Sequence, residues 1–196
     1  MPDSFAYRRA HYDYEICKRL HSEGATLKSK ILHLGCNLGV NSILLAEMGY
    51  DVVGVDIQQA AIDKANNIWS TWKGKVKGNV EFFCQDFTKL SLPYKFNSLV
   101  SFDTFEHVWE EDLVAIHNNI VAHLNSGSQM YIHVPLERSF FDPAHVCLYN
   151  ENKAKRLWGS KFFMSKIWTT QDGTRDNIGR ITSVTGHRIN MLMEVK

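Results

Sequence analysis

Closely spaced glycines and an acidic residue at the end of an apolar run are the first residues in the chain that could do chemistry. Gly35 and Gly39 follow the apolar run at residues 30–34 and are separated by three residues. Glycine in such a turn lets a ligand approach the main chain with no Cβ in the way. Asp56 ends the next apolar run, where a carboxylate can accept hydrogen bonds from both hydroxyls of a ribose. Together these features predict a pocket for an adenosine-containing ligand.

The spacing of the two glycines bears on which adenosine compound is bound. A dinucleotide fingerprint needs G-x-G-x-x-G, which places a pyrophosphate at the N-terminus of the following helix. Residues 35–39 read Gly-Cys-Asn-Leu-Gly instead. The spacing therefore disfavours nicotinamide and flavin dinucleotides, and a dehydrogenase with them.

Histidines supply the candidates for a general base, which must lie near the strand ends beside the reacting group. His107 follows Asp103 by four residues, and His145 lies in the sequence DPAHV. We expect His107 and His145 to be the catalytic candidates, whereas His133, inside an apolar run, is more typical of a structural histidine. For each of the three, the alternative is a histidine that bonds to the backbone and does no chemistry.

A metal site is not expected. His133, Asp142 and His145 have suitable residue types, but their spacing is not a compact ligand motif. The four cysteines are far apart and form no C-x-x-C pair, which favours reduced thiols. His117 and His123 lie in a helical pattern, and we expect them at its surface or boundary.

Alternating strands and helices must position these residues. Short apolar runs predict strands, and apolar residues at helical spacing predict helices. The expected strands are residues 30–35, 51–56, 80–87, 95–105, 128–135, 160–170 and 186–196, and the expected helices are residues 40–50, 57–72, 112–124 and 150–159. The helix at 57–72 should bury Trp69 and Trp72 on one face, and residues 171–180 are expected to form a polar loop.

This alternation predicts an α/β protein with a doubly wound, mostly parallel, seven-stranded sheet. The last two strands have no helix between them, so we expect an antiparallel C-terminal strand pair, with helices on both faces of the sheet. Residues 1–24 are expected to form an N-terminal helical segment, and residues 25–196 are expected to form one domain.

The balance of charged residues indicates which kinds of partner the protein binds. The chain has 196 residues, of which 22 are basic and 21 acidic, for a net charge of +1. A protein that tracks phosphates usually clusters Lys and Arg on one face, so a nucleic-acid partner is not indicated. The N-terminal sequence has no apolar h-region, and no run reaches the ~18 apolar residues of a membrane span. We expect a cytoplasmic protein without a membrane span, either a monomer or a homodimer.

Five segments in order resemble the motifs of the class I S-adenosylmethionine-dependent methyltransferases, in particular small ones of the type that includes ubiquinone-biosynthesis-like enzymes. These segments are ILHLGCNLG, VVGVDI, CQDF, SFDTFEHV and HLNSGSQMYIHVP. Each is weak alone, but their order and spacing make the resemblance specific over residues 25–150. The resemblance implies S-adenosyl-L-methionine as the cofactor, S-adenosyl-L-homocysteine as its product, and no metal.

The resemblance also implies roles for individual residues. The implied cofactor-binding set is His33, Gly35, Cys36, Asn37, Gly39, Asp56, Ile57, Asp86, Phe87 and Asp103. Asp56 would hold the ribose hydroxyls, and Ile57 and Phe87 would contact the adenine. Asp86 would accept from the adenine amino group, and the main chain of Asp103 would meet the methionine amino group. The segment DPAHV would face the acceptor, and residues 1–24 would form a lid over the cofactor.

Two positions depart from the family's pattern. His33 stands where the family usually has an acidic residue that helps to hold the cofactor's ammonium group, and a neutral imidazole supplies no charge. Asn37 stands where glycine is common, although asparagine tolerates positive φ better than other residues do. The expected activity is methyl transfer to an oxygen, nitrogen or carbon nucleophile of a small-molecule acceptor. A non-catalytic cofactor-binding relative and an RNA-modifying methyltransferase are the alternatives.

Overall fold

The computed structural model describes residues 30–136, 143–175 and 181–195, so the expected helical segment at 1–24 lies outside the described residues. The strands are β1 (Lys30–Leu34), β2 (Asp51–Asp56), β3 (Val80–Cys84), β4 (Phe96–Phe102), β5 (Leu124–Pro135), β6 (Phe162–Arg175) and β7 (Ile181–Val195). The α-helices are α2 (Val40–Glu47), α3 (Gln59–Trp72), α4 (Leu113–His123) and α5 (Glu151–Gly159). Short 3-10 helices lie between them, namely η1 (Phe87–Lys89), η2 (Phe105–His107) and η3 (Glu110–Asp112).

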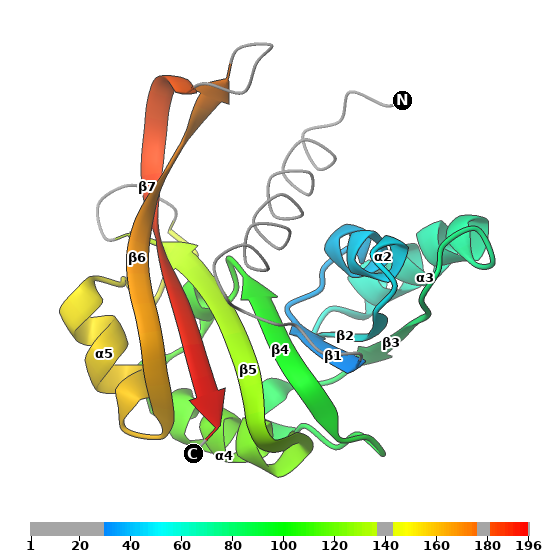
Figure 1. Cartoon of the computed structure of the whole chain (residues 1–196), viewed down its shortest axis with the longest axis horizontal. Helices are drawn as coiled ribbons and strands as arrows, with labels where there is room; N and C mark the ends of the chain where they lie inside the picture. Colours follow the sequence, from blue (N-terminus) through cyan, green and yellow to red (C-terminus); the bar gives the residue numbers. More distant parts are fainter. Residues whose placement is uncertain (1–29, 137–142, 176–180, 196) are drawn as a thin grey trace.

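The strands form one seven-stranded sheet in the order β3-β2-β1-β4-β5-β7-β6 (Figure 1). Strands β1 to β5 pair in parallel, whereas β7 runs antiparallel to both β5 and β6. After β3 the chain returns to the other side of β1, so the strand order reverses between β1 and β4. In open parallel sheets, ligands bind beyond the carboxyl ends of the strands at such a reversal. The predicted fold class is confirmed.

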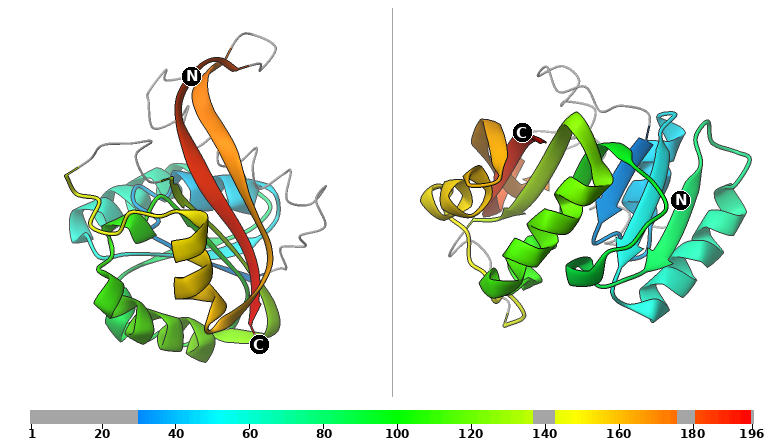
Figure 2. Two further views of the ribbon diagram at one scale, coloured as in Figure 1. Left: turned by 90° about the vertical axis from the view of Figure 1, so that its left-hand side faces the viewer. Right: turned by 90° about the horizontal axis from the view of Figure 1, so that it is seen from below.

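Alternate residues of each strand pack on opposite faces of the sheet, because successive side chains of a strand point to opposite sides. Leu32 and Leu34 of β1 belong to a core that includes Trp158 of α5 and several residues of α4. Ile31 lies in a second core together with Trp69 of α3 and residues of α2. Helices α4 and α5 therefore cover one face of the sheet and α2 and α3 the other (Figure 2).

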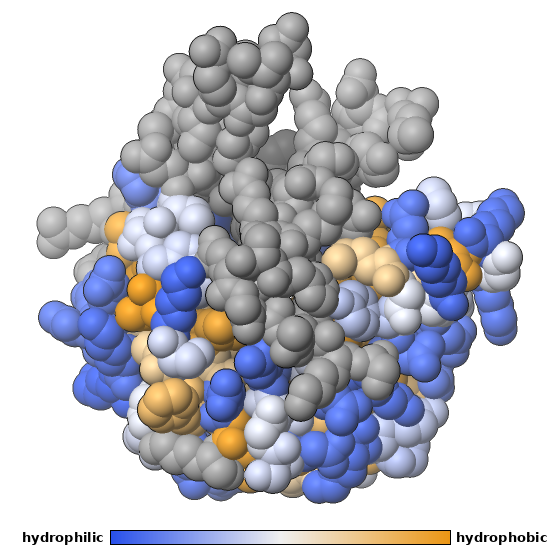
Figure 3. Space-filling view, viewed as in Figure 1, coloured by the Kyte–Doolittle hydropathy of each residue, from blue (hydrophilic) through white to orange (hydrophobic). Residues whose placement is uncertain are grey.

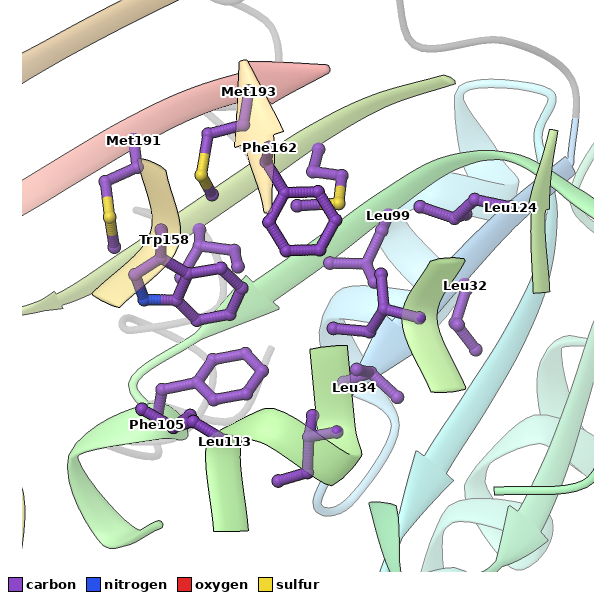
Figure 4. Packing of buried hydrophobic residues seen from close by; sticks show 14 of the residues in the cluster. Leu32, Leu34, Leu99, Phe105, Leu113, Leu124, Trp158, Phe162, Met191 and Met193 are labelled. Carbon is purple, nitrogen blue, oxygen red and sulfur yellow. The ribbon is translucent and has the colours of Figure 1, made fainter. Parts of the chain in front are cut away.

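Trp158 lies among the aromatic residues of the larger core (Figure 4). Its ring centroid is 4.8 Å from that of Phe105 and 4.4 Å from that of His117. His117 is only 3% exposed, so the expected surface or boundary position was wrong for this residue. Loss of hydration on burial, assisted by Lys161, lowers the pKa of His117 to about 4 and keeps the imidazole neutral.

The two C-terminal strands are longer than expected. The polar loop expected at 171–180 is wrong over residues 171–175, because β6 continues to Arg175, and residues 176–180 lie outside the described residues. β7 joins β5 at Arg188, and its earlier residues pair with β6, so this ribbon extends beyond the rest of the sheet (Figure 1). A ladder is made by backbone groups, so a polar segment without an apolar stripe can continue a strand.

Polar and apolar residues are mixed on the described surface. On the face seen in Figure 3, hydrophilic residues are interspersed with smaller apolar areas. Trp72, expected on the buried face of α3, is 44% exposed, because it lies in the last turn of the helix, one turn beyond the buried Trp69. No helix within the described ranges combines the length and the apolarity that crossing a membrane requires.

Candidate functional site

The loop at residues 35–39 joins β1 to α2 at the carboxyl edge of the sheet. It turns through positive φ at Gly35 (74°), Asn37 (46°) and Gly39 (74°). Glycine adopts these values without strain, and asparagine tolerates them. A Cβ on Gly35 would lie 2.0 Å from Oγ1 of Thr104, the second residue after β4. The missing Cβ therefore makes room for the neighbouring segment of the chain as well as for the turn.

The amides of this loop hold it against β2. The N–H groups of Gly35 and Cys36 both donate to the carbonyl of Val55, at 2.9 and 3.1 Å. The N–H of Asn37 donates to Oδ2 of Asp56 at 2.9 Å. The loop therefore offers a ligand a fixed shape, since these three donors are already used. The thiol of Cys36 is 3% exposed, and burial raises its pKa far above the usual range, which keeps it protonated.

Asp56 lies at the end of β2, directly beside the glycine loop. Its Oδ1 accepts a hydrogen bond from the N–H of Gln58 at 3.0 Å, while Oδ2 holds the loop. Each carboxylate oxygen can accept two hydrogen bonds, so Asp56 retains capacity for a ligand. The next residue, Ile57, is 64% exposed. A carboxylate and an exposed apolar side chain thus stand side by side at the strand end.

Asp86 and Phe87 follow β3 at the same edge of the sheet, since Cys84 of β3 is in register with Asp56. Oδ1 of Asp86 accepts from both the N–H and the hydroxyl of Thr88, each at 2.8 Å, and so caps η1. These hydrogen bonds hold the pKa of Asp86 below its usual value. Phe87 is half-buried, and its carbonyl accepts a hydrogen bond from Asn119 of α4.

His33 lies inside β1, beneath the glycine loop, and is 1% exposed. Its Nδ1 is 2.7 Å from the hydroxyl of Ser42 on α2, and its ring packs edge-on against Phe102. Burial lowers the pKa of His33 to about 3, so the imidazole is neutral at physiological pH. A repulsive positive charge at this position is thereby excluded. Nε2 is buried and has no hydrogen-bond partner within the described part of the chain.

Asp103, at the end of β4, connects three strands through its side chain. Its Oδ1 accepts hydrogen bonds from Nε2 of His133 on β5, at 3.0 Å, and from Nη1 of Arg188 on β7. The backbone of Asp103 has a positive φ of 46°, and its N–H donates to the carbonyl of His133. Arg188 is 5% exposed and His133 is fully buried. The sequence analysis missed Arg188, and the available signal was a charged residue directly before the mostly apolar segment 189–193 of an expected strand.

The two predicted catalytic histidines lie together. The ring centroids of His107, in η2, and His145, after β5, are 4.9 Å apart in an edge-to-face arrangement. Glu106 joins them, and ligand-type atoms of the three residues all lie within 4.8 Å of one another. The sequence analysis missed Glu106, because the sequence does not show that this acidic residue is buried. His133, which it had grouped with His145 when weighing a metal, contacts Asp103 instead, and Asp142 lies outside the described residues.

Hydrogen bonds tie the segment after β5 to η2. The N–H groups of Val146 and Cys147 donate to the carbonyl of Glu106 at 2.9 and 3.0 Å. Nδ1 of His107 lies 3.0 Å from the carbonyl of Ala144. A carbonyl only accepts, so Nδ1 carries the proton of the neutral ring and Nε2 keeps its lone pair.

Comparison with known proteins gives sequence matches to methyltransferases. A family model described as a methyltransferase domain matches residues 31–127. An uncharacterized methyltransferase of Schizosaccharomyces pombe is 33% identical over 87 residues, which are 44% of this chain and 57% of that protein. The chain therefore spans little more than half the length of this curated relative.

Two solved structures share the fold over nearly the whole chain. Magnesium protoporphyrin IX methyltransferase from Synechocystis, with bound SAH, has a TM-score of 0.72 at 14% identity, covering 100% of this chain and 89% of that one. The N-methyltransferase NodS from Bradyrhizobium japonicum has a TM-score of 0.72 at 15% identity, covering 99% of each chain. The family match, this fold and the ordered strand-end motifs lead to one conclusion: the chain carries a methyltransferase domain of the class I S-adenosylmethionine-dependent type.

Proposed function

We propose that this protein transfers a methyl group from S-adenosyl-L-methionine to a nucleophilic atom of a small-molecule acceptor. The observation that carries the proposal is the half-buried carboxylate of Asp56 next to Ile57, which is 64% exposed, at the rim of the glycine loop. An adenosine needs this combination, because its ribose presents two hydroxyls and its adenine an apolar ring face. Family membership supports the same ligand.

The residues at the strand ends fit the nucleoside half of the cofactor. We assign the ribose hydroxyls to Asp56 and one face of the adenine to Ile57. Oδ1 of Asp86 is used by Thr88, so we assign the adenine amino group to Oδ2, with Phe87 beside the ring. Gly35, Cys36, Asn37 and Gly39 would shape the wall next to the ribose and the methionine chain. These assignments place every carboxylate at an edge of the ligand that donates hydrogen bonds.

The residues near the methionine half of the cofactor match it less well, because His33 is neutral and Asp103 is already paired. Nε2 of His33 is a buried polar atom without a protein partner in the described ranges, which suits a hydrogen bond to the cofactor or to a bridging water. The neutral ring contributes no charge to an ammonium group, and the carboxylate of Asp103 is already paired with Arg188. We therefore expect weaker cofactor binding than in relatives with an acidic residue at position 33.

When bound, the cofactor supplies a sulfonium whose methyl group is already activated. The chain must align the acceptor in line with the carbon–sulfur bond, exclude water and accept a proton from a protonated nucleophile. The acceptor atom bonds to the methyl carbon while the carbon–sulfur electron pair stays on sulfur. We assign the removal of this proton to the acceptor-facing edge formed by His107 and His145, where the carbonyl of Ala144 orients Nδ1 of His107. General bases of this kind contribute about 10²–10⁴-fold in rate.

The experiment that tests the proposal is calorimetric titration of the full chain with S-adenosyl-L-methionine, with S-adenosyl-L-homocysteine and with NAD. We expect micromolar binding of the two sulfur compounds and none of NAD. Asp56→Ala should weaken binding by about 10- to 150-fold, because hydrogen bonds to a charged group contribute about 1.5–3 kcal/mol. Asp51→Ala is the matched control, since Asp51 is an exposed aspartate at the opposite end of β2 that accepts a hydrogen bond from Asn79.

Two results would contradict the proposal: binding of NAD in place of the sulfur compounds, or equal affinities of Asp56→Ala and Asp51→Ala. A cofactor-binding relative without catalysis is the second candidate, because the buried residue at position 33 is neutral. It predicts that the sulfur compounds bind normally while no methyl transfer follows with any acceptor in a broad screen. The acceptor named for the Synechocystis relative, magnesium protoporphyrin IX, is a small molecule, which supports the choice of acceptor class.

A further inference from the structure

The cluster of Glu106, His107 and His145 has the residue types of a metal site. Two imidazoles and one carboxylate are the protein ligands of many catalytic zinc centres and of non-haem iron centres. These three residues lie on two segments that follow neighbouring parallel strands, β4 and β5. We propose that they bind one divalent transition-metal ion of the zinc type, with a coordination position left open for an oxygen ligand.

The distances within the cluster are close to those a bound ion requires. Nε2 of His107 and Oε1 of Glu106 are 3.9 Å apart, and ligand atoms of all three residues lie within 4.8 Å of one another. With metal–ligand bonds of about 2.0–2.1 Å in a tetrahedral site, neighbouring ligand atoms are separated by about 3.3 Å. Contraction by up to about 1.5 Å therefore suffices, and rotation about side-chain torsions is the means of supplying it.

The hydrogen bond from His107 to Ala144 prepares the imidazole for a metal. Metal-binding histidines almost always donate their second ring N–H to a carbonyl or a carboxylate, which fixes the ring and its tautomer. Nδ1 of His107 has such a carbonyl partner at 3.0 Å, so the lone pair of Nε2 faces the cluster. The hydrogen bonds from Val146 and Cys147 to the carbonyl of Glu106 hold the two ligand-bearing segments in register. The site is thus largely formed without the ion.

Burial of the carboxylate gives the ion an electrostatic role. The side chain of Glu106 is 2% exposed, whereas that of His107 is 44% exposed. Buried charges in proteins are paired or coordinate metals, because an unpaired buried charge is costly. Coordination would place the charge of a divalent ion directly beside the carboxylate of Glu106. The exposed edge at His107 gives the ion a route in from solvent.

A bound ion would also define the class of acceptor, and this part rests on the proposed methyl transfer. A hydroxyl coordinated to a divalent metal loses its proton more readily, so the acceptor would be an oxygen nucleophile. Its oxygen bonds to the methyl carbon, the carbon–sulfur bond breaks with its electron pair left on sulfur, and the hydroxyl proton goes to solvent. The products are a methyl ether and a neutral thioether. In this arrangement Nε2 of His107 is a ligand and does not accept the proton.

Metal binding is tested on the full chain after dialysis against a chelator. Co²⁺ is titrated and followed by its visible absorption, and Zn²⁺ is titrated by calorimetry. We expect one equivalent of each ion. Affinity should fall by about 100-fold or more in His107→Ala and in His145→Ala, because loss of an outer-shell partner alone typically costs about 10- to 100-fold. The control is His187→Ala, because His187 is a half-buried histidine outside the cluster whose backbone carbonyl accepts from Leu136.

The outcomes separate this inference from the proposed function. Absence of metal binding, or equal affinity in His107→Ala and in the His187→Ala control, overturns the metal site. Glu106→Gln adds a test of the carboxylate, and circular dichroism reports whether this buried variant folds. S-adenosyl-L-methionine is titrated into the metal-free protein in parallel. Metal binding without cofactor binding would overturn the proposed function alone, and cofactor binding without metal binding would overturn the metal site alone.

Discussion

Replacing Gly35 by alanine tests how the glycine loop is fixed. The φ of 74° costs a residue with a Cβ about 1–2 kcal/mol. The added Cβ would also lie 2.0 Å from Oγ1 and 2.4 Å from Cγ2 of Thr104, and overpacking of this kind costs about 1–3 kcal/mol. We therefore expect Gly35→Ala to lower the free energy of unfolding by about 2–5 kcal/mol, as measured by urea denaturation.

The chain contains a control that separates the two contributions. Gly127 has a φ of 70°, but an added Cβ there would meet nothing within 4 Å. Gly127→Ala should therefore show the cost of positive φ alone, about 1–2 kcal/mol. Thr104→Ala in the Gly35→Ala background removes the two closest contacts and should recover part of the excess loss. Equal losses in Gly35→Ala and Gly127→Ala would refute the packing argument.

Four further predictions concern buried charge, pH and binding. Arg188→Met should lower the free energy of unfolding by about 3–5 kcal/mol, because it leaves the carboxylate of Asp103 buried without the guanidinium group of Arg188. Adding Asp103→Asn removes that buried charge and should recover part of the loss, as measured by urea denaturation. As pH falls from about 6.5 to about 4, His117 becomes protonated in the unfolded chain but stays neutral in the folded protein. The free energy of unfolding should therefore fall by up to about 3 kcal/mol. His117→Phe should remove this part of the pH dependence, and identical pH profiles of unfolding would contradict the prediction. His33→Asp should tighten cofactor binding by about 10-fold in calorimetry, as expected of a charge-assisted hydrogen bond, and weaker binding would show that His33 does not replace an acidic residue. His107→Ala should reduce kcat by about 10²-fold or more with little change in cofactor Kd, and equal losses in both would indicate a structural role.

Sequence patterns sufficed for the sheet because its parallel strands are apolar runs linked by helices with a clear stripe. They also placed Asp56 at the carboxyl end of a strand, which the structure confirms. The strand segments at 171–175 and 181–185 were not predicted, because backbone pairing does not require an alternation of apolar residues. His117 was misplaced because a helical pattern does not say which of its polar positions meets a neighbouring helix.

The remaining parts of the site depend on long-range contacts that a pattern does not encode. Arg188 and Asp103 are 85 positions apart, and their contact requires β7 to enter between β5 and β6 in one register. Glu106 sits next to His107 in the sequence, but its burial depends on the segment after β5 folding back onto η2. A slip of one residue in β7 would turn Arg188 to the other face of the sheet. Such contacts are decided by tertiary structure.

The position of β7 in the sheet bears on the order in which the protein can assemble during synthesis. Strands β1 to β5 and their helices leave the ribosome first and can pair among themselves, because each finds its neighbours in the chain already made. β6 cannot join them when it emerges, since its partner in the sheet is β7, which follows it. The ion pair between Asp103 and Arg188 also cannot form until β7 has been synthesised. Until β7 pairs with β5, the growing chain therefore has an unpaired sheet edge at β5, and such an edge is a template for pairing with another chain.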